Sequence, residues 1–378
     1  MKVTKRINFL KSLLFCGMIV GLFICAFTSM GLTSEKQNVQ KVIKWKMQSC
    51  WPPGLIFHQE DKRFVELVKK MSGGRLDIEL FTNGALCGCF EVFETVKNGS
   101  IEIGSDWTLY WEGYNSAFMA FGSTPSFFTT QDYFNWYLHG GGKELIYKLY
   151  DKFGLHFLPK AGLAPETGFW SNTPYRTADD YKGQKVRISG KIQGAVLKDL
   201  GGIPVAMAGS ETYEALRRGI LDATEFNMPS VDVTFGYQEI SKYVSGPSWW
   251  QSGCMLNYTV NKKAWDELPD DLKEIVEQAA VANALYFTTF YEYENIEAMK
   301  KIKEAGVEIV SMDAESIDRI QRLIRKHTKE EADKNPDFAA VINSMERYAR
   351  DMIPVREFAE PWSYGETPKW LYEEQGKK

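Results

Sequence analysis

The sequence predicts an α/β fold built from two lobes. Residues 41–104 alternate strand-like and helix-like segments in the order β-α-β-α-β, and residues 185–226 repeat the alternation. Residues 270–303 follow as a long stretch with few helix breakers. Alternating strands and helices are typical of a lobe with a largely parallel sheet. The two units lie roughly 80 residues apart, which implies two lobes rather than one long sheet.

The first unit shows both strand and helix periodicities. Charged and apolar residues alternate over residues 41–47, which predicts a strand, and CWPPG at 50–54 ends it as a loop. Apolar residues recur at helical spacing over residues 57–71, and Ser-Gly-Gly closes that helix. The remaining predicted elements are a strand at 76–81, a short helix at 91–98 and a strand at 101–104.

The second unit and the C-terminal part continue the pattern. We expect a strand at 185–188, helices at 191–200 and 211–218, and a strand at 221–226. The helix at 270–303 is too long for one globular face, so we expect it to span both lobes or an interface. Residues 319–350 predict further helices, and residues 360–378 a loose tail.

These elements predict five parts of the chain. They are a signal peptide (1–34), lobe I (40–160, with parts of 250–300), lobe II (161–249), a long spanning helix (262–305), and C-terminal helices with a tail (306–378).

The first residues have the pattern of an export signal. An apolar run at 13–27 follows four basic residues, Lys2, Lys5, Arg6 and Lys11. A basic start, a short apolar stretch and a small-residue exit are typical of a secretory signal peptide. The run is shorter than the ~20 apolar residues that a spanning helix needs. We expect a periplasmic protein, with an uncleaved N-terminal anchor as the alternative.

The charge balance argues against nucleic acid and anionic membranes as partners. The chain has 45 basic and 49 acidic residues, and losing the signal with its four cations leaves 41 against 49, a net charge near −8. A surface of that sign repels phosphate groups.

Four cysteines follow the signal: Cys50, Cys87, Cys89 and Cys254. An oxidising compartment permits disulfides. The Cys-Gly-Cys spacing is too short for a common zinc framework, and no histidine lies close by. We expect at least one disulfide, with Cys50 paired to Cys87 or Cys89. Buried thiols without a bond are the alternative.

Enzyme signatures are scarce in this chain. It has no nucleophile elbow, phosphate-binding loop, His-Glu-x-x-His motif or dinucleotide fingerprint. Its four histidines are too dispersed for a catalytic triad or a zinc site. We therefore expect a binding protein that is not an enzyme. One alternative is a sensor-coupled binding protein. A second is a lyase or hydrolase that uses Glu166 and Glu225 as acid and base.

Aromatic side chains suggest where a ligand would bind. They make up 14% of the chain, and several fall in predicted loops at strand ends, where α/β folds bind ligands. These residues are Trp51, Trp107, Tyr110, Trp111, Trp170, Trp249 and Trp250.

Two charged residues also end predicted strands. Arg187 could hold a carboxylate through two parallel hydrogen bonds, although a surface ion pair is the plainer interpretation. Glu225 would repel an acid in the same pocket unless a cation lay between them.

Four stretches of the chain make it resemble a known family. They are KVRISG (185–190), MAGSETYEALRRGILDATE (207–225), PSWWQSG (247–253) and NKKAW (261–265). With them the chain resembles the solute-binding subunits of tripartite ATP-independent periplasmic (TRAP) transporters. The likeness runs from about residue 44 to residue 352 and favours the branch that binds 2-oxo and 2-hydroxy monocarboxylates.

The resemblance implies a fold and a task. The fold would be periplasmic binding protein-like, with two α/β lobes joined by a hinge and a long helix, and a helical C-terminal extension. The task would be to capture a small carboxylic acid in the cleft without catalysis. The acid would then pass to the membrane permease subunits of the transporter.

The resemblance also assigns residues to a substrate site. Arg187 falls on the carboxylate-binding arginine of the family, and Tyr110 on a ligand-contacting tyrosine. Phe226 and the adjacent Asn227 are further candidates, and Trp250 belongs to the aromatic segment that lines the site.

A bridging metal ion, Ca²⁺ or Na⁺, is implied in the same way. Its ligands would be Glu166, Glu225, Gln251 and the backbone carbonyl of Phe226. Relatives commonly carry Gln where Glu166 stands and an acid near Gln251. If both positions correspond, the two side chains have traded places with the formal charge kept; if Gln251 is out of register, the metal's ligand shell is altered and the metal assignment is weaker. Two carboxylates and an anionic ligand would suit calcium better than sodium.

The chain departs from the family pattern at two places. Residues 87–89 replace an apolar-Pro stretch, and Cys50 lies in the equivalent first loop, so a disulfide within that lobe is expected. Trp107 and Leu109 differ from the family's residues beside Tyr110, which leaves the ligand's size open. A homodimer through the C-terminal helices is the last expectation.

Overall fold

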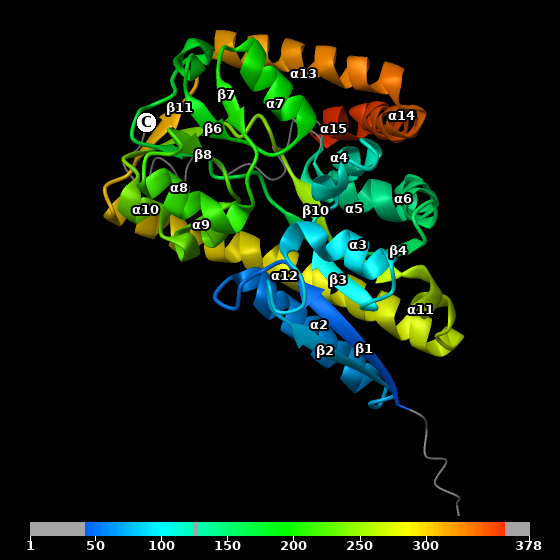
Figure 1. The fold of residues 1–378 in the computed structure, drawn as a ribbon. Coiled ribbons are helices and arrows are strands. Elements are labelled where there is room, and N and C mark those ends of the chain that lie inside the picture. Colours follow the sequence, from blue (N-terminus) through cyan, green and yellow to red (C-terminus); the bar gives the residue numbers. More distant parts are fainter. Residues whose placement is uncertain (1–41, 124–127, 360–378) are drawn as a thin grey trace, which may run out of the picture. The chain divides into compact units, whose positions relative to one another are not determined.

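The computed structural model describes residues 42–123 and 128–359, which belong to one compact unit. The expected signal peptide and tail lie outside these residues. The described part has two β-sheets with helices packed around them (Figure 1), so the predicted α/β class is confirmed. No helix within the described ranges is long and apolar enough to cross a membrane.

The first sheet has the strand order β2-β1-β3-β10-β4. Its strands are β2 (Leu76–Phe81), β1 (Ile43–Ser49), β3 (Ile103–Asp106), β10 (Cys254–Asn261) and β4 (Leu155–Leu163). β1 runs parallel to β2 and β3, whereas β10 runs antiparallel to β3 and β4. The expectation of a largely parallel sheet is therefore wrong here, because a late strand from beyond the second sheet inserts in the opposite direction.

The second sheet has the order β11-β9-β5-β8-β6-β7. Its strands are β11 (Glu308–Ser311), β9 (Tyr243–Gly246), β5 (Phe169–Ser171), β8 (Ala223–Thr224), β6 (Lys185–Arg187) and β7 (Ile203–Val205). β6 is parallel to β7 and β8, and β5 is antiparallel to β8 and β9. β8 is shorter than the predicted strand, which leaves residues 225–227 outside the sheet.

Helices fill the connections between strands. Around the first sheet they are α2 (Ile56–Met71), η1 (Cys89–Glu91), α3 (Val92–Lys97), η2 (Thr108–Trp111), α4 (Ala117–Gly122), α5 (Thr130–His139), α6 (Gly142–Asp151) and α11 (Lys262–Asp266). Around the second they are η3 (Ala178–Tyr181), α7 (Lys191–Asp199), η4 (Gly209–Glu211), α8 (Thr212–Arg217), α9 (Pro229–Phe235) and α10 (Tyr237–Ile240).

The predicted long helix is confirmed as α12 (Asp270–Glu304). Two acidic residues occupy its first turn and two lysines its last turn, which suits the helix dipole at both ends. α12 packs against α2 and β4 of the first sheet's layer and against α9 of the second (Figure 1). One continuous helix thus supports both sheets.

A helical C-terminal extension follows β11, as predicted. It comprises α13 (Ala314–Lys334), α14 (Pro336–Asp351) and α15 (Ile353–Ala359). The side chain of Asp313 caps α13, and the side chain of Asn335 caps α14, where Pro336 fits the first turn. α13 packs on α7, and α14 on α4 and α6, so the extension contacts helices of both layers.

A disulfide joins Cys50, just after β1, to Cys89 in η1. This confirms the predicted bridge and selects Cys89 over Cys87. The thiols of Cys87 and Cys254 are free.

Candidate ligand-binding site

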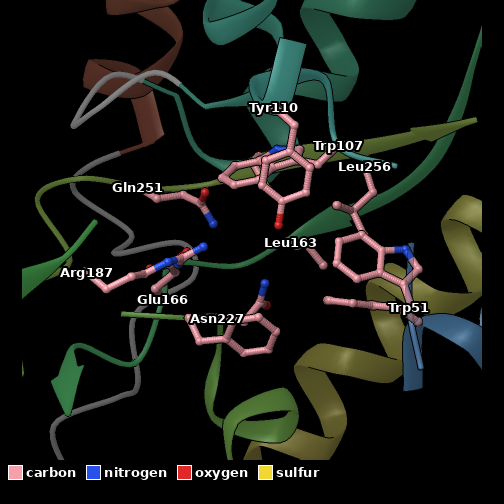
Figure 2. Close-up of a pocket in the computed structure, with 12 residues that line it drawn as sticks. Trp51, Trp107, Tyr110, Leu163, Glu166, Arg187, Asn227, Gln251 and Leu256 are labelled. Carbon is pink, nitrogen blue, oxygen red and sulfur yellow. The ribbon is translucent and has the colours of Figure 1, made fainter. Parts of the chain in front are cut away.

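A pocket of about 320 Å³ lies where strand ends from both sheets meet (Figure 2). The first sheet contributes residues that follow β1 and β3 or end β4, and the second contributes residues at the ends of β6 and β8. The lining residues are Trp51, Phe57, Trp107, Tyr110, Leu163, Glu166, Arg187, Phe226, Asn227, Gln251, Cys254 and Leu256. Carboxyl ends of strands are where α/β folds place ligands, because the backbone there leaves the sheet and frees side chains.

Polar groups meet inside this pocket. Figure 2 shows the Tyr110 hydroxyl and the Asn227 amide pointing toward one another, while Gln251 and Arg187 approach from the side. Burial raises the pKa of Tyr110 to about 12, so its hydroxyl keeps its proton and can donate a hydrogen bond at neutral pH. The Asn227 side-chain oxygen accepts from the Met228 amide at 2.9 Å, which leaves its NH₂ group as a donor for the pocket.

Arg187 and Glu225 form a buried ion pair beside the pocket. Arg187 donates through Nη1 to Glu225 Oε2, and through Nε to the Met207 carbonyl at 3.2 Å. Glu225 Oε1 accepts from the Ser189 amide at 2.7 Å. Both side chains are 3% exposed, so each charge depends on the other. Glu225 does not itself line the pocket, and its repulsion of an acid is screened by Arg187.

Glu166 presents a second carboxyl group, held by the aromatic segment. Trp250 does not line the pocket; its indole Nε1 donates to Glu166 Oε2, and Ser248 Oγ donates to the Glu166 carbonyl. Burial, followed by the negative charge of Glu225, raises the pKa of Glu166 well above its usual value. The hydrogen bond from the Trp250 indole fixes the orientation of the Glu166 carboxyl group.

The site carries more carboxyl groups than cationic groups. Glu166 and Glu225 lie near a third buried carboxyl group, Asp232, whereas Arg187 is the one cation among the residues that line the pocket. The described residues contain no cluster of three or more His, Cys, Asp and Glu side chains able to hold a metal. A cation here would need amide and backbone oxygens as well. Each carboxylate oxygen has two lone pairs, so the pairing of Glu225 leaves it able to ligate.

One supporting residue, Asp232, was not recognised from sequence. Asp232, on α9, accepts from the backbone N–H of Asn227 at 2.9 Å and from Trp170 Nε1 at 2.7 Å. Asp232 thereby holds the turn that follows β8 in place. Trp170 stabilises the same turn by donating to Asp232, and it does not line the pocket. An Asp in the first turn of a helix is so common that no local signal distinguishes this one.

The apolar walls were predicted in part. Trp51 and Trp107 stand at strand ends, as the sequence indicated. Phe57, Leu163 and Leu256 also line the pocket, but in sequence they are indistinguishable from core residues. The other aromatic candidates, Trp111 and Trp249, are buried and do not line it.

Comparison with known proteins adds to this geometry. The family described as "Bacterial extracellular solute-binding protein, family 7" matches residues 47–335. A relative from Nostoc sp., named monocarboxylate 2-oxoacid-binding periplasmic protein, is 28% identical over 321 residues, which cover 85% of this chain and 88% of the relative.

Two solved structures are similar over most of the chain. A TRAP periplasmic solute-binding protein from Pseudoalteromonas atlantica, with bound sodium and pyruvate, has a TM-score of 0.81 and 28% identity, covering 87% of this chain and 100% of that one. One from Colwellia psychrerythraea, with bound calcium and pyruvate, has a TM-score of 0.80 and 29% identity, covering 85% and 98%. The similarity confirms the periplasmic binding protein-like fold.

Proposed function

Since this chain belongs to the bacterial extracellular solute-binding proteins of family 7, we propose that its solute is a small 2-oxo or 2-hydroxy carboxylic acid. It is a TRAP solute receptor and not an enzyme. The observation that carries the choice of solute is the group of donors in the pocket: the Arg187 guanidinium, the Tyr110 hydroxyl and the Asn227 amide. In a 2-oxo acid the two carboxylate oxygens and the neighbouring 2-oxo oxygen are all hydrogen-bond acceptors, which these donors would satisfy.

Arg187 would hold the carboxylate while remaining paired with Glu225. Its fork carries five donors, of which Nε and Nη1 already have partners within the protein. The Nη2 group would face the acid, and Tyr110 with Asn227 would receive the remaining oxygens. Phe226 would pack against the ligand from the second sheet's side.

A cation would join the acid to the protein. We propose that Glu166, Glu225, Gln251 and the Phe226 carbonyl would hold Ca²⁺ or Na⁺, because all four offer the oxygen donors that hard cations take. The surplus of carboxyl groups over cations at the pocket supports this. The bound ion would supply positive charge between the ligand's oxygens and the two carboxylates. Calcium suits that charge balance better than sodium.

Further proposals concern the export of the protein, its compartment and its oligomeric state. Residues 1–34 would direct export and be removed, which the intact mass of the exported protein would reveal. Relatives named as periplasmic and the TRAP structures support a periplasmic receptor that delivers its solute to membrane permease subunits.

Two copies of the protein would associate through the C-terminal helices, where Phe358 of α15 is 82% exposed. Light scattering would measure the mass of the assembly.

Tyr110→Phe gives the cleanest test of the site, because it removes one hydroxyl and keeps the ring. Arg187→Ala is less informative, since it would leave Glu225 buried without its partner. We expect Tyr110→Phe to weaken pyruvate binding about tenfold, the value of a hydrogen bond to a charged group. Isothermal titration calorimetry in buffer with sodium and calcium would measure it.

Tyr114→Phe is the matched control, since Tyr114 is exposed and outside the pocket. It should bind pyruvate like the wild type. An unchanged affinity in Tyr110→Phe would remove Tyr110 from the site. Absence of binding to pyruvate, lactate and branched 2-oxo acids alike would overturn the proposed solute class.

A further inference from the structure

Glu112 joins the two sides of the pocket by a hydrogen bond. It follows η2, two positions beyond Tyr110, and its Oε2 accepts from the backbone N–H of Lys191 at 2.9 Å. Lys191 begins α7, four positions beyond Arg187. Tyr110 lies in the first sheet's layer, and Arg187 ends β6 of the second sheet. This hydrogen bond therefore links the segments that carry two of the proposed solute-binding residues.

The N-terminus of α7 is a favourable place for the Glu112 carboxylate. The residue before the helix, Gly190, has no side chain that could cap it, and no acidic residue occupies the first turn. The unpaired N–H groups at the start of a helix carry partial positive charge and attract a negative group. Glu112 supplies that group from the other layer, so α7 is capped across the pocket rather than by its own sequence.

Both ends of this contact are anchored close to the pocket. On the first layer, the Glu112 amide donates to the Leu109 carbonyl at 3.1 Å, within the turn that contains Tyr110. On the second, the Ser189 amide donates to Glu225 Oε1 at 2.7 Å, which ties the loop before α7 to the buried ion pair. A shift of one end relative to the other would therefore move the groups that face the acid.

The polar groups of the pocket are closed off from solvent. Arg187 and Gln251 are each 2% exposed, and Glu166 is 6% exposed. A solute that binds among them must pass the segments that cover them. The acid therefore enters and leaves only when the two sides of the pocket part.

We propose that Glu112 is a positioning residue for solute binding, whose bond to the start of α7 holds the Tyr110 and Arg187 segments together around the acid. The bond breaks when the pocket opens and forms again when it closes, so it slows release of the acid more than it affects capture. Glu112 does not line the pocket and acts through these segments. The inference rests on the proposed function, because it needs the acid between them.

Substitution of Glu112 tests the contact through the kinetics of pyruvate. Glu112→Ala removes the acceptor and should raise the dissociation rate and the Kd about tenfold, while the association rate changes less than about twofold. Glu112→Gln keeps a side-chain oxygen as acceptor and should stay within about threefold of the wild type. Stopped-flow fluorescence of the tryptophans in the pocket would measure both rates on the exported protein, in buffer with sodium and calcium.

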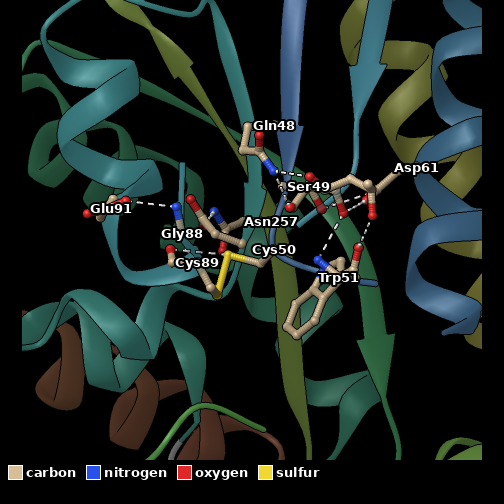
Figure 3. Close-up of a disulfide and its surroundings, with 12 residues drawn as sticks. Gln48, Ser49, Cys50, Trp51, Asp61, Gly88, Cys89, Glu91 and Asn257 are labelled. Atoms are coloured by element: carbon tan, nitrogen blue, oxygen red, sulfur yellow. Dashed lines mark hydrogen bonds between the residues drawn. A yellow bond between two sulfur atoms is a disulfide. The ribbon is translucent and has the colours of Figure 1, made fainter. Parts of the chain in front are cut away.

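Two other glutamates of the first layer accept a backbone N–H without crossing the pocket. Glu91 Oε2 accepts from Gly88 at 2.8 Å (Figure 3), and Glu102 Oε2 accepts from Lys46 at 2.7 Å. Glu102 is half-buried, as Glu112 is, which makes Glu102→Ala the matched control. It should release pyruvate at the wild-type rate.

Lys191→Pro removes the donor of the same hydrogen bond. Proline is well tolerated at the first position of a helix, where its missing N–H costs no bond within the helix. Lys191→Ala is the reference, because both variants lose the ion pair with Glu331 of α13 but the alanine keeps its N–H. The proline variant should bind pyruvate about tenfold more weakly than the alanine variant when Glu112 is present, and equally well in the Glu112→Ala background.

The outcomes separate this inference from the proposed function. If the wild type binds pyruvate and Glu112→Ala releases it at the same rate, the positioning role is overturned and the proposed function stands. Equal loss from Lys191→Pro with and without Glu112, or faster release from Glu102→Ala as well, would also overturn the role. A wild type that binds none of the 2-oxo and 2-hydroxy acids would overturn the proposed function, and this inference with it.

Discussion

Glu60, on α2, lies among fully buried polar side chains. Tyr291 donates to its Oε2 at 2.9 Å, Lys160 Nζ lies 3.7 Å from the same oxygen, and Oε1 has no partner. Lys160 is bound more closely to Asp61, at 2.6 Å. The single ammonium group of Lys160 thus lies close to the carboxyl groups of both Glu60 and Asp61. Burial raises the pKa of Glu60 to about 8, although Lys160 opposes the shift.

The raised pKa of Glu60 predicts a pH-dependent stability. Unfolding returns its pKa to about 4.5, so the folded protein holds the proton more tightly, and stability falls as pH rises from about 4.5 to about 8. Glu60→Gln cannot ionise and keeps an oxygen for Tyr291. Its free energy of unfolding, relative to wild type, should rise across that range by a few kcal/mol, on the order of magnitude that such a shift implies.

Denaturant titrations at several pH values would measure this difference. Glu66→Gln, on the exposed face of the same helix, is the control and should follow the wild type. Parallel pH profiles of Glu60→Gln and wild type would contradict the assignment of the proton to Glu60.

At the scale of elements, the Cys50–Cys89 disulfide ties the end of β1 to η1 across 39 residues. Closing a loop of that length reduces the number of conformations that the unfolded chain can adopt. Disulfides typically add about 2–4 kcal/mol to the free energy of unfolding in this way. Cys89→Ser should lower the free energy of unfolding by about that amount.

Cys87→Ser provides the matched control for the disulfide, because Cys87 is half-buried and unbonded. It should change stability by less than about 0.5 kcal/mol, as substitutions away from key contacts usually do. Thermal melts with and without reductant would compare the three proteins, and reductant should erase the difference between wild type and Cys89→Ser. Equal loss in both serine variants would mean that Cys50 pairs with either cysteine.

Individual elements differ in how far local patterns predict them. α2 and α12 were predicted within one residue at each end, because helical spacing and breakers such as Pro269 are local signals. β4 was missed, because Pro159 and Lys160 interrupt an otherwise apolar run. The structure tolerates them since β4 is an edge strand, where a missing amide donor costs little, and Lys160 pairs with Asp61.

At the scale of the whole molecule, two sheets are joined by the segments that surround the pocket. Residues 164–168 connect β4 to β5, residues 247–253 connect β9 to β10, and α12 carries the chain toward β11. Two of the proposed metal ligands, Glu166 and Gln251, lie on the first two of these segments. A bound ion would therefore bridge the connections as well as the ligand.

This arrangement predicts that metal and acid stabilise the protein together. Pyruvate at about 100 times its Kd should raise the free energy of unfolding by about 2.7 kcal/mol. If calcium is the bridge, a chelator should reduce that gain and added calcium should restore it. Differential scanning fluorimetry would follow the melting temperature.

Sodium dependence without sensitivity to the chelator would assign sodium to the site. Replacing sodium with a large organic cation, in the presence of chelator, separates the two ions. Ligand stabilisation that survives both treatments unchanged would contradict a bridging metal.

The sequence by itself determined the α/β class, the long helix, the bridge from Cys50 and the family, because periodicity, breakers and short motifs are local. It also named most of the polar residues that the structure brings to one pocket: Tyr110, Glu166, Arg187, Asn227 and Gln251. Their roles with ligand and metal stay predictions. Strand-end positions were informative because parallel strands end on the same side of a sheet.

Only the tertiary structure decided which groups meet. It pairs Arg187 with Glu225, brings the Trp250 indole to Glu166 and selects Cys89 for the bridge. These outcomes depend on distances between segments far apart in the chain. Arg187 and Glu225 lie 38 residues apart and meet because β6 and β8 are neighbours, a pairing that no local pattern encodes.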